Sequence, residues 1–358
     1  MTLLLTNEEV ERALTPQDAI DATECIYREL AEGRAVNRPR SQTYMPVESQ
    51  EHPGFRYRFK SQEGSSAQSG VWALRITSDM AGFSYTAGVK RRRILPVATG
   101  NRYCGLVILF DIEKIEPVAL MPDGVIQKLR VAALSVVGAK YLAQAQPKVL
   151  GLIGSGWQAG AHLEFLCSQF SFDRVKVYSP NGEHCREFCR KMTVQLGREV
   201  EAVDSSQQAV EESDFVQAAT AAWDPVFDGR LVQKGMYVAS IGGSDASNKR
   251  REIDDETIRR ADLYVVHSKE VAQLDQSPDV WEVAQKGIMK WEAIQEVQDL
   301  VAGKIPGRTS AEQITVFNNN TGAGTQFAAL GAAVLRRARA MGMGREIPTE
   351  WFLEDVSP

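Results

Sequence analysis

The feature that most constrains the fold is a glycine-rich turn after a short apolar run. Residues 149–153 are apolar, and Gly154-Ser-Gly156-Trp-Gln-Ala159 follows as Gly-x-Gly-x-x-Ala before a helix-like segment. Gly154 permits a tight turn, Gly156 lets the backbone approach a ligand, and Ala159 lets the helix pack closely on the strand. The helix N-terminus then presents unpaired N–H groups and a positive dipole end to an anion. This order predicts a site for a dinucleotide pyrophosphate; the alternative is a purely structural turn.

Strand and helix patterns alternate around this turn, from about residue 148 to 310. The strand-like segments after the turn are residues 174–178, 214–220, 236–241 and 261–266. Such alternation predicts βαβ units and a parallel sheet. We therefore expect an α/β fold with a Rossmann dinucleotide-binding domain.

The region before residue 124 has a different pattern. Two strands are expected at 71–77 and 105–111, separated by a segment that contains Gly, Arg and Pro, which is typical of a mixed α+β domain. Near the other end, residues 326–340 read as a helix that should pack back on the N-terminal region. The predicted division is an α+β domain from 1–124 and 312–358, with the Rossmann domain at 125–311.

Composition excludes several classes of protein. The chain of 358 residues carries 24% charged and 44% hydrophobic residues, which is ordinary for a soluble globular protein. A net charge of -5 argues against a nucleic-acid partner. The basic cluster at 91–93 is interpreted as a solvated loop, with contact to an anionic cofactor or substrate as the alternative.

Targeting and cysteine patterns favour a cytoplasmic protein. No secretory signal is present at the start, and no apolar run approaches the ~20 residues that span a bilayer, so no membrane partner is expected. The five cysteines have no paired spacing. They are interpreted as reduced thiols, with no metal site expected.

A helix predicted over 124–143 carries a chemical clue. Arg130 lies inside its apolar stripe, which comprises Ile126, Leu129, Ala133, Val136 and Val137. A buried guanidinium is costly unless an anion pairs with it, and its planar fork matches a carboxylate. Arg130 therefore either pairs with an internal acid or receives a substrate carboxylate.

A second clue follows the strand at 236–241. Ligands in open α/β sheets bind beyond the carboxyl ends of the strands, and Gly242-Gly-Ser-Asp245 lies there. Asp245 would act as a base or bind an amine near a nicotinamide. The alternative is that it caps the next helix.

The end of the second Rossmann strand bears on the choice of cofactor. NAD enzymes usually place an acid there, which would repel a 2′-phosphate. Here residues 178–181 are Tyr-Ser-Pro-Asn, with no acid before Glu183. Ser179 and Asn181 can donate to a phosphate, and Arg186 follows about one turn on. The cofactor is thus NADP(H) or NAD(H), and the pattern favours NADP(H).

These segments together resemble the ornithine cyclodeaminase/μ-crystallin family. The resemblance runs from about Arg38 to Leu330. It rests on 105–111, the Leu-Arg-Val-Ala-Ala of 129–133, 149–159, Ser-Ile-Gly-Gly at 240–243 with Asp245, Arg-Glu-Ile-Asp at 251–254, Gly-Arg-Thr-Ser at 307–310 and 314–317.

The resemblance implies a Rossmann domain joined to a substrate and dimerisation domain built from both chain ends, hence a homodimer. In the family, three cations hold the substrate carboxylate, and an acid after Gly-Gly handles the amino group or proton. Arg40 and Arg130 match the first and last cations. The strand lysine is Arg75 here, with Lys60 as an alternative, and the loop between Gly243 and Glu252 is slightly longer than usual.

The implied activity is NAD(P)-dependent hydride transfer at the C–N bond of a small amino or imino acid. Ornithine cyclodeamination, ketimine or imino-acid reduction and amino-acid dehydrogenation all use one such site. The alternative is a non-catalytic, crystallin-like NADP(H)-binding protein. The predicted catalytic residues are Asp245 and Arg130, and the predicted substrate-binding residues are Arg40, Lys60, Arg75 and Arg130. The predicted cofactor-binding residues are Gly154, Ser155, Gly156, Trp157, Gln158, Ala159, Ser179, Asn181, Thr220 and Gly242.

Overall fold

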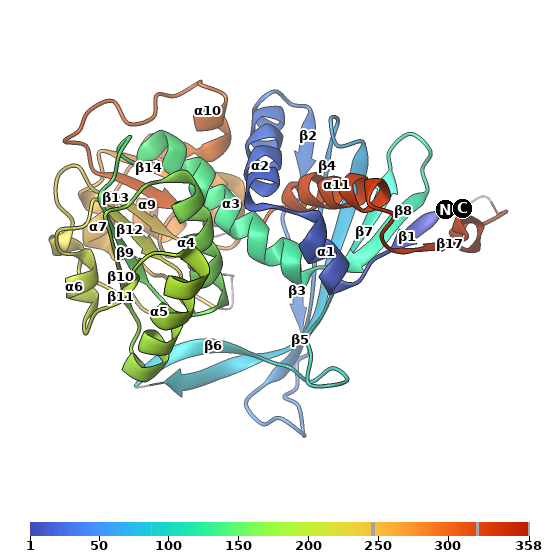
Figure 1. The fold of residues 1–358 in the computed structure, drawn as a ribbon, viewed down its shortest axis with the longest axis horizontal. Helices are drawn as coiled ribbons and strands as arrows, with labels where there is room; N and C mark the ends of the chain where they lie inside the picture. The colour runs from blue at the N-terminus through green and yellow to red at the C-terminus, as the bar shows by residue number, and fades with distance from the viewer. Residues whose placement is uncertain (87, 245–247, 320–321, 357–358) are drawn as a thin grey trace. The chain divides into compact units, whose positions relative to one another are not determined.

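The structure is a computed structural model that describes residues 1–86, 88–244, 248–319 and 322–356 (Figure 1). Its contacts divide the chain into two compact units. The first unit comprises Met1–Gly82, Ile94–Arg130 and Gly322–Pro358, and the second comprises Phe83–Arg93 and Val131–Thr321. The sequence predicts the boundaries between the two domains at 124/125 and 311/312, and it does not assign the short segment at 83–93 to the second domain.

The first unit is built on a mostly antiparallel sheet. The strand order is β17-β1-β8-β7-β5-β4-β2, with β3 on β4 and β6 on β5, and β1 runs parallel to its neighbour β8. The predicted strands at 71–77 and 105–111 are confirmed as parts of β5 and β7. The strands are β1 (Thr2–Leu4), β2 (Ala35–Asn37), β3 (Ser41–Tyr44), β4 (Arg56–Ser66), β5 (Val71–Thr86), β6 (Val89–Leu95), β7 (Cys104–Asp111), β8 (Pro117–Pro122) and β17 (Arg345–Ile347).

The basic cluster at 91–93 lies in β6, so its interpretation as a loop is wrong. Val89–Leu95 carries four consecutive basic residues between apolar ones, so it lacks the apolar alternation by which a strand is predicted from sequence. Its pairing with β5 comes from a hairpin that the Gly- and Pro-containing sequence did not suggest.

Helices cover one face of the first sheet. They are α1 (Asn7–Ala13), α2 (Pro16–Ala31), α11 (Gly324–Ala340) and the 3-10 turn η3 (Thr349–Phe352), with α3 (Gly124–Leu142) starting in this unit. Capping boxes at Thr6 and Thr15 fix the starts of α1 and α2. As predicted, α11 packs back on the N-terminal region, against β4 and α2. Gly64 allows this close approach, since a Cβ there would lie 2.2 Å from the Thr325 nitrogen.

The second unit contains the predicted parallel sheet. Its strand order is β11-β10-β9-β12-β13-β16-β14-β15, and each recorded pair is parallel. The strands are β9 (Val149–Ile153), β10 (Arg174–Tyr178), β11 (Glu201–Ala202), β12 (Phe215–Ala218), β13 (Tyr237–Ser240), β14 (Leu263–Val266), β15 (Gln295–Glu296) and β16 (Thr315–Asn318). The fold class is thus confirmed as α/β with a Rossmann domain.

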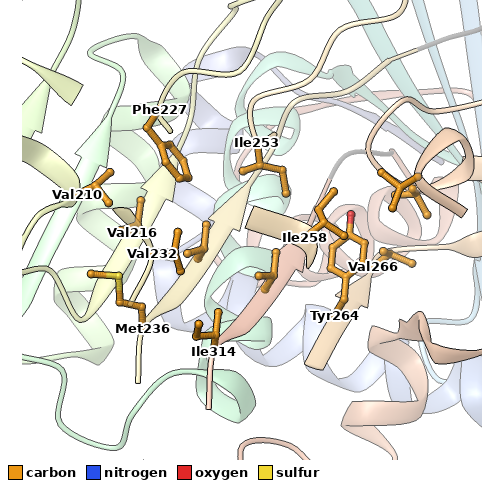
Figure 2. Close-up of a cluster of buried hydrophobic side chains, with 14 of the residues drawn as sticks. Val210, Val216, Phe227, Val232, Met236, Ile253, Ile258, Tyr264, Val266 and Ile314 are labelled. Carbon is orange, nitrogen blue, oxygen red and sulfur yellow. The ribbon is translucent and has the colours of Figure 1, made fainter. Parts of the chain in front are cut away.

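The helices of the second unit connect these strands. They are α4 (Trp157–Gln169), α5 (Gly182–Leu196), α6 (Ser206–Val210), α7 (Asp255–Arg259), α8 (Lys269–Leu274), α9 (Trp281–Gln285) and α10 (Val297–Val301), with 3-10 turns η1 (Gly229–Leu231) and η2 (Trp291–Ala293). Apolar side chains from β12, β13, β14 and β16 form the core beneath them, including Val216, Tyr264 and Val266 (Figure 2). This core fixes the carboxyl ends of the strands, where a ligand would bind.

The described residues show neither a candidate membrane-spanning helix nor a candidate metal site. None of their helices combines the length and apolar character that a bilayer crossing requires. Nor do they contain a group of three or more His, Cys, Asp or Glu side chains arranged to hold a metal ion.

Candidate active site

The glycine turn of the second unit joins β9 to α4, as the sequence predicts. Gly154 has φ 122°, and a Cβ there would lie 2.3 Å from the Ala219 carbonyl oxygen. The fold itself therefore requires this glycine. Gly156 is the N-cap of α4, and a Cβ there would have no atom within 4 Å. Gly156 thus leaves open space in front of a helix N-terminus, which is the arrangement that a pyrophosphate needs.

A cavity of ≈ 780 Å³ opens at this turn, wholly within the second unit. Six of the predicted cofactor-binding residues line it: Gly154, Ser155, Gly156, Ser179, Asn181 and Thr220. Such a volume and a glycine cradle fit a dinucleotide.

Four predicted cofactor residues do not line this cavity: Trp157, Gln158, Ala159 and Gly242. Trp157 is 54% exposed, and Ala159 is buried in α4. A Cβ on Gly242 would meet the side chain of Glu252, so this glycine makes room for a neighbouring residue. The pattern of the turn identified the right loop but not which of its side chains face the cavity.

Ser155 and His184 connect the glycine turn to the start of α5. The Ser155 hydroxyl lies 2.9 Å from Nδ1 of His184, and the Asn181 side-chain oxygen accepts from the His184 backbone N–H at 3.0 Å. Asn181 is thus the N-cap of α5. The side-chain oxygen of Asn181 is thus used to cap the helix. The Ser179 hydroxyl is a second candidate donor at the end of β10.

Glu252 is a buried residue to which the sequence reasoning assigned no role. Its carboxylate accepts from the Thr220 hydroxyl at 2.7 Å and from the Ile241 backbone N–H at 2.7 Å. Burial raises the pKa of this carboxyl. Because Thr220 follows β12 and Ile241 follows β13, Glu252 ties together two strand ends at the cavity rim. The only signal was its place in the Arg-Glu-Ile-Asp segment that carries the family resemblance. Asp245, the predicted acid of the same region, lies outside the described residues.

Arg130 lies in the first unit, in the α3 stripe where the sequence placed it, and is buried. Its guanidinium donates to the amide oxygens of Gln127 at 3.0 Å and of Gln326 at 3.1 Å. Burial, followed by the charges of Arg75 and Arg40, lowers the pKa of Arg130 to about 9. The surroundings therefore disfavour this cation on its own, and an added anion would stabilise it.

Arg75 has a different environment in the same cluster. Its Nε and Nη2 donate to one carboxylate oxygen of Asp123, at 2.8 and 2.6 Å, and its Nη1 donates to Gln62 at 2.7 Å. Asp123 thus neutralises Arg75, an ion pair that the sequence analysis did not foresee. Gly105 makes room for it, since a Cβ there would lie 2.1 Å from an Asp123 oxygen.

Arg40 and Lys60 lie near this cluster in the same unit. Arg40 directly precedes β3, and its charge contributes to the lowered pKa of Arg130. Lys60 pairs with Thr77 across β4 and β5, and Gln62 pairs with Arg75. Since residues two apart on a strand share a face, Lys60 lies on the face that carries Gln62. The structure thus gathers the predicted cations Arg40, Arg75 and Arg130 around one region and places Lys60 at its border.

Comparisons with known proteins agree with this geometry. The model of the ornithine cyclodeaminase/mu-crystallin family matches residues 1–340. A Delta(1)-pyrroline-2-carboxylate reductase from Bacillus cereus is 31% identical over 68% of this chain and 74% of its own length. The iminosuccinate reductase of Paracoccus denitrificans is 28% identical over 96% of this chain and 99% of its own.

A solved structure shows the same fold with ligands. The Delta(1)-pyrroline-2-carboxylate reductase of Thermococcus litoralis, in complex with NADH and L-proline, has a TM-score of 0.82 and 27% identity. The match covers 97% of this chain and 100% of that one. With its Rossmann sheet, glycine turn and matched family segments, the chain belongs to the ornithine cyclodeaminase/mu-crystallin family of NAD(P)-dependent oxidoreductases.

Proposed function

We propose that this protein reduces the C=N bond of a small imino acid with NAD(P)H, and oxidises the amino acid in the reverse direction. The observation that carries the proposal is Arg130, a guanidinium that donates to amide oxygens and whose pKa is lowered by burial and then by neighbouring cations. Such a group favours an anionic ligand, and the carboxylate of an α-imino acid matches its fork.

The first unit's contribution is to bind and orient the substrate. Arg130 would make the bidentate contact, and Arg40 would add charge on the same carboxylate. Arg75 would act mainly through Arg130, because Asp123 and Gln62 already hold its guanidinium. Fixing the carboxylate fixes the α-carbon, and such positioning supplies much of the rate in reactions of this kind.

The second unit would hold the dinucleotide at the glycine turn. When bound, the nicotinamide supplies or accepts the hydride. Asp245 is proposed, from its place after Gly-Gly, to give or take the proton on the substrate nitrogen.

The relatives suggest which imino acids to test first. Because one relative is named for pyrroline-2-carboxylate and another for iminosuccinate, both a cyclic and an open-chain α-imino acid are candidates. We place the cyclic imino acid first, since the solved Delta(1)-pyrroline-2-carboxylate reductase that shares this fold holds L-proline.

We further propose a preference for NADP(H). At the end of β10 the cavity is lined by Ser179, Pro180 and Asn181, and none of these would repel a 2′-phosphate. Arg186, named from the sequence as a possible phosphate ligand, is exposed and does not line the cavity.

A homodimer is also proposed, through the outer face of the first unit's sheet. Over residues 71–78 of β5 burial alternates: Arg75 and Thr77 are buried, whereas Trp72, Leu74 and Ile76 on the other face are half-buried. Phe59 on β4 is 42% exposed on that side. An apolar sheet face of this kind is typical of a subunit contact.

The decisive experiment measures turnover in both directions. Purified protein is mixed with Δ1-pyrroline-2-carboxylate, or with oxaloacetate and ammonia, and with NADPH or NADH. Ornithine, lysine, alanine and proline are tested with the oxidised cofactors, and reduced cofactor and ammonia are followed together. Imine-dependent oxidation of NAD(P)H supports the proposal. Ammonia released without net reduced cofactor would indicate a cyclodeaminase instead. No turnover in any mixture would contradict the proposal and favour a binding protein.

A further inference from the structure

Most of β6, residues 89–93, belongs to the second unit, and its contacts there are specific. Arg91 forms an antiparallel bridge with Ala222, the Arg92 backbone N–H donates to the Ala221 carbonyl, and the Trp223 backbone N–H donates to the Lys90 carbonyl. The strand is therefore fixed beside the loop that follows β12. That loop lines the dinucleotide cavity.

Two side chains of β6 bring positive charge to this cavity. Among the described residues that line it, the permanently cationic ones are Lys90 and Arg91. The Lys90 ammonium lies 4.0 Å from the ring centroid of Trp223 and 4.5 Å from that of Phe83, so it is already held by two aromatic faces. Arg91 has no such contact. Its Nε is buried, without a hydrogen-bond partner among the described residues.

Since its Nε is closed off from solvent, a ligand in the cavity would meet Arg91 through its terminal nitrogens, and an anionic acceptor there is favourable. We infer that Arg91 binds the 2′-phosphate of NADP(H) and sets the preference for NADP(H) over NAD(H). The inference rests on the proposed function only for the class of cofactor, not for the substrate or the reaction.

The 2′-phosphate is a better assignment than the pyrophosphate. The pyrophosphate is met by the glycine turn and the N-terminus of α4, which supply backbone N–H groups and need no arginine. At the end of β10, where the adenine ribose is read, the lining side chains are neutral. Ser179 offers one hydroxyl there, and Asn181 is partly committed to capping α5. A dianionic phosphate must therefore find its cation on β6, and we assign Arg91 because Lys90 is already held by two aromatic rings.

The experiment measures ligand binding rather than turnover. Calorimetric titrations with NADPH, NADH, 2′,5′-ADP and 5′-AMP are made on the wild type, Arg91→Gln and Arg93→Gln. Arg93 lies on the same strand but is exposed, so its variant is the matched control. Thermal unfolding of each variant checks that β6 stays folded.

Arg91→Gln should weaken NADPH and 2′,5′-ADP by about 10- to 100-fold, since hydrogen bonds to charged groups contribute ~1.5–3 kcal/mol and each 1.4 kcal/mol is tenfold. NADH and 5′-AMP should change by less than about 3-fold, and Arg93→Gln should match the wild type. Equal weakening of both cofactors would overturn the inference in favour of a pyrophosphate contact or a role in shape. Unchanged NADPH binding would also overturn it. Either result leaves imine reduction standing, so this failure is distinguishable from failure of the proposed function.

Discussion

The arginine cluster of the first unit and the glycine turn of the second are both built to bind an anion, but they use different parts of the chain. The turn offers backbone N–H groups, a helix N-terminus and the open space before Gly156. The cluster offers buried side chains, with Arg130 among the amide oxygens of Gln127 and Gln326.

Because of this difference, the two sites affect the free energy of folding in different ways. Backbone N–H groups at a helix start exist in any folded state, so the turn places no uncompensated charge in the protein interior. A buried guanidinium disfavours the fold until an anion arrives, as the lowered pKa of Arg130 indicates. A change at the ligand-facing Gly156 should therefore cost little stability, whereas the arginine cluster lowers the stability of the fold in return for binding an anion.

Replacing Arg130 tests this exchange most strongly. Arg130→Met keeps most of the volume and removes the charge. We expect kcat/KM for imine reduction to fall about 10³-fold, because truncating a buried charged contact costs ~2–5 kcal/mol and each 1.36 kcal/mol is tenfold. NADPH affinity should stay unchanged, as measured by titration.

The stability of this variant gives the second half of the test. The folded-state pKa of Arg130 is below its ordinary value, so the charged side chain destabilises the fold at neutral pH. Arg130→Met should thus unfold at the same or a higher urea concentration. Arg28→Met, at an exposed position of α2, should change neither quantity. A fully active Arg130→Met would contradict the assignment of the carboxylate site.

Asp123→Asn asks whether Arg75 is structural, in contrast to Arg130. Breaking a buried ion pair costs ~3–5 kcal/mol, because the remaining charge stays buried. We expect a loss of about 3 kcal/mol in the free energy of unfolding, measured by urea titration. The exposed pair Arg174–Glu201 is the control, and Glu201→Gln should cost less than ~1 kcal/mol. Equal losses would mean that Asp123 does not hold Arg75 in the folded protein.

Local patterns predicted most of the fold. The glycine turn, the strand at 174–178 and the helix from Gly124 depend on nearby residues, and each was found where expected. The hairpin that adds β6 was missed, because its pairing with β5 and its bridge to Ala222 depend on residues far apart in the chain. A basic run without apolar alternation carries no local signal for such pairing.

A site residue could be predicted from the sequence where its environment depends on residues nearby in the chain. The burial of Arg130 followed from its place in an apolar stripe. The partner of Arg75 did not, because Asp123 is 48 residues away along the chain and only the sheet brings the two together. Glu252 was missed for the same reason, because its contact with Thr220 is not revealed by a single sequence. The cluster that contains Arg91 was interpreted as a loop, with contact to an anionic ligand as the alternative, and its bridge to Ala222 was not foreseen.

The two glycines of the turn provide the smallest and most selective test. Gly156→Ala adds a methyl group where no protein atom lies within 4 Å, at an extended backbone that any residue adopts. Its cost to stability should stay below ~1 kcal/mol, which is the usual scale of an N-cap change. The methyl would occupy the space through which the backbone approaches a pyrophosphate. We therefore expect NADPH and NADH to bind about 10-fold more weakly, by equal factors.

Gly154→Ala is the matched comparison at the same turn. It combines a φ of 122° with a Cβ 2.3 Å from the Ala219 oxygen, so it should lower the free energy of unfolding by ~1–3 kcal/mol or more. Thermal melts and titrations of the two variants then separate fold from binding. If Gly156→Ala kept full affinity for both cofactors, the pyrophosphate would not pass over Gly156. If it weakened only NADPH, the turn would be reading the 2′-phosphate, and the division of roles between the turn and Arg91 would be wrong.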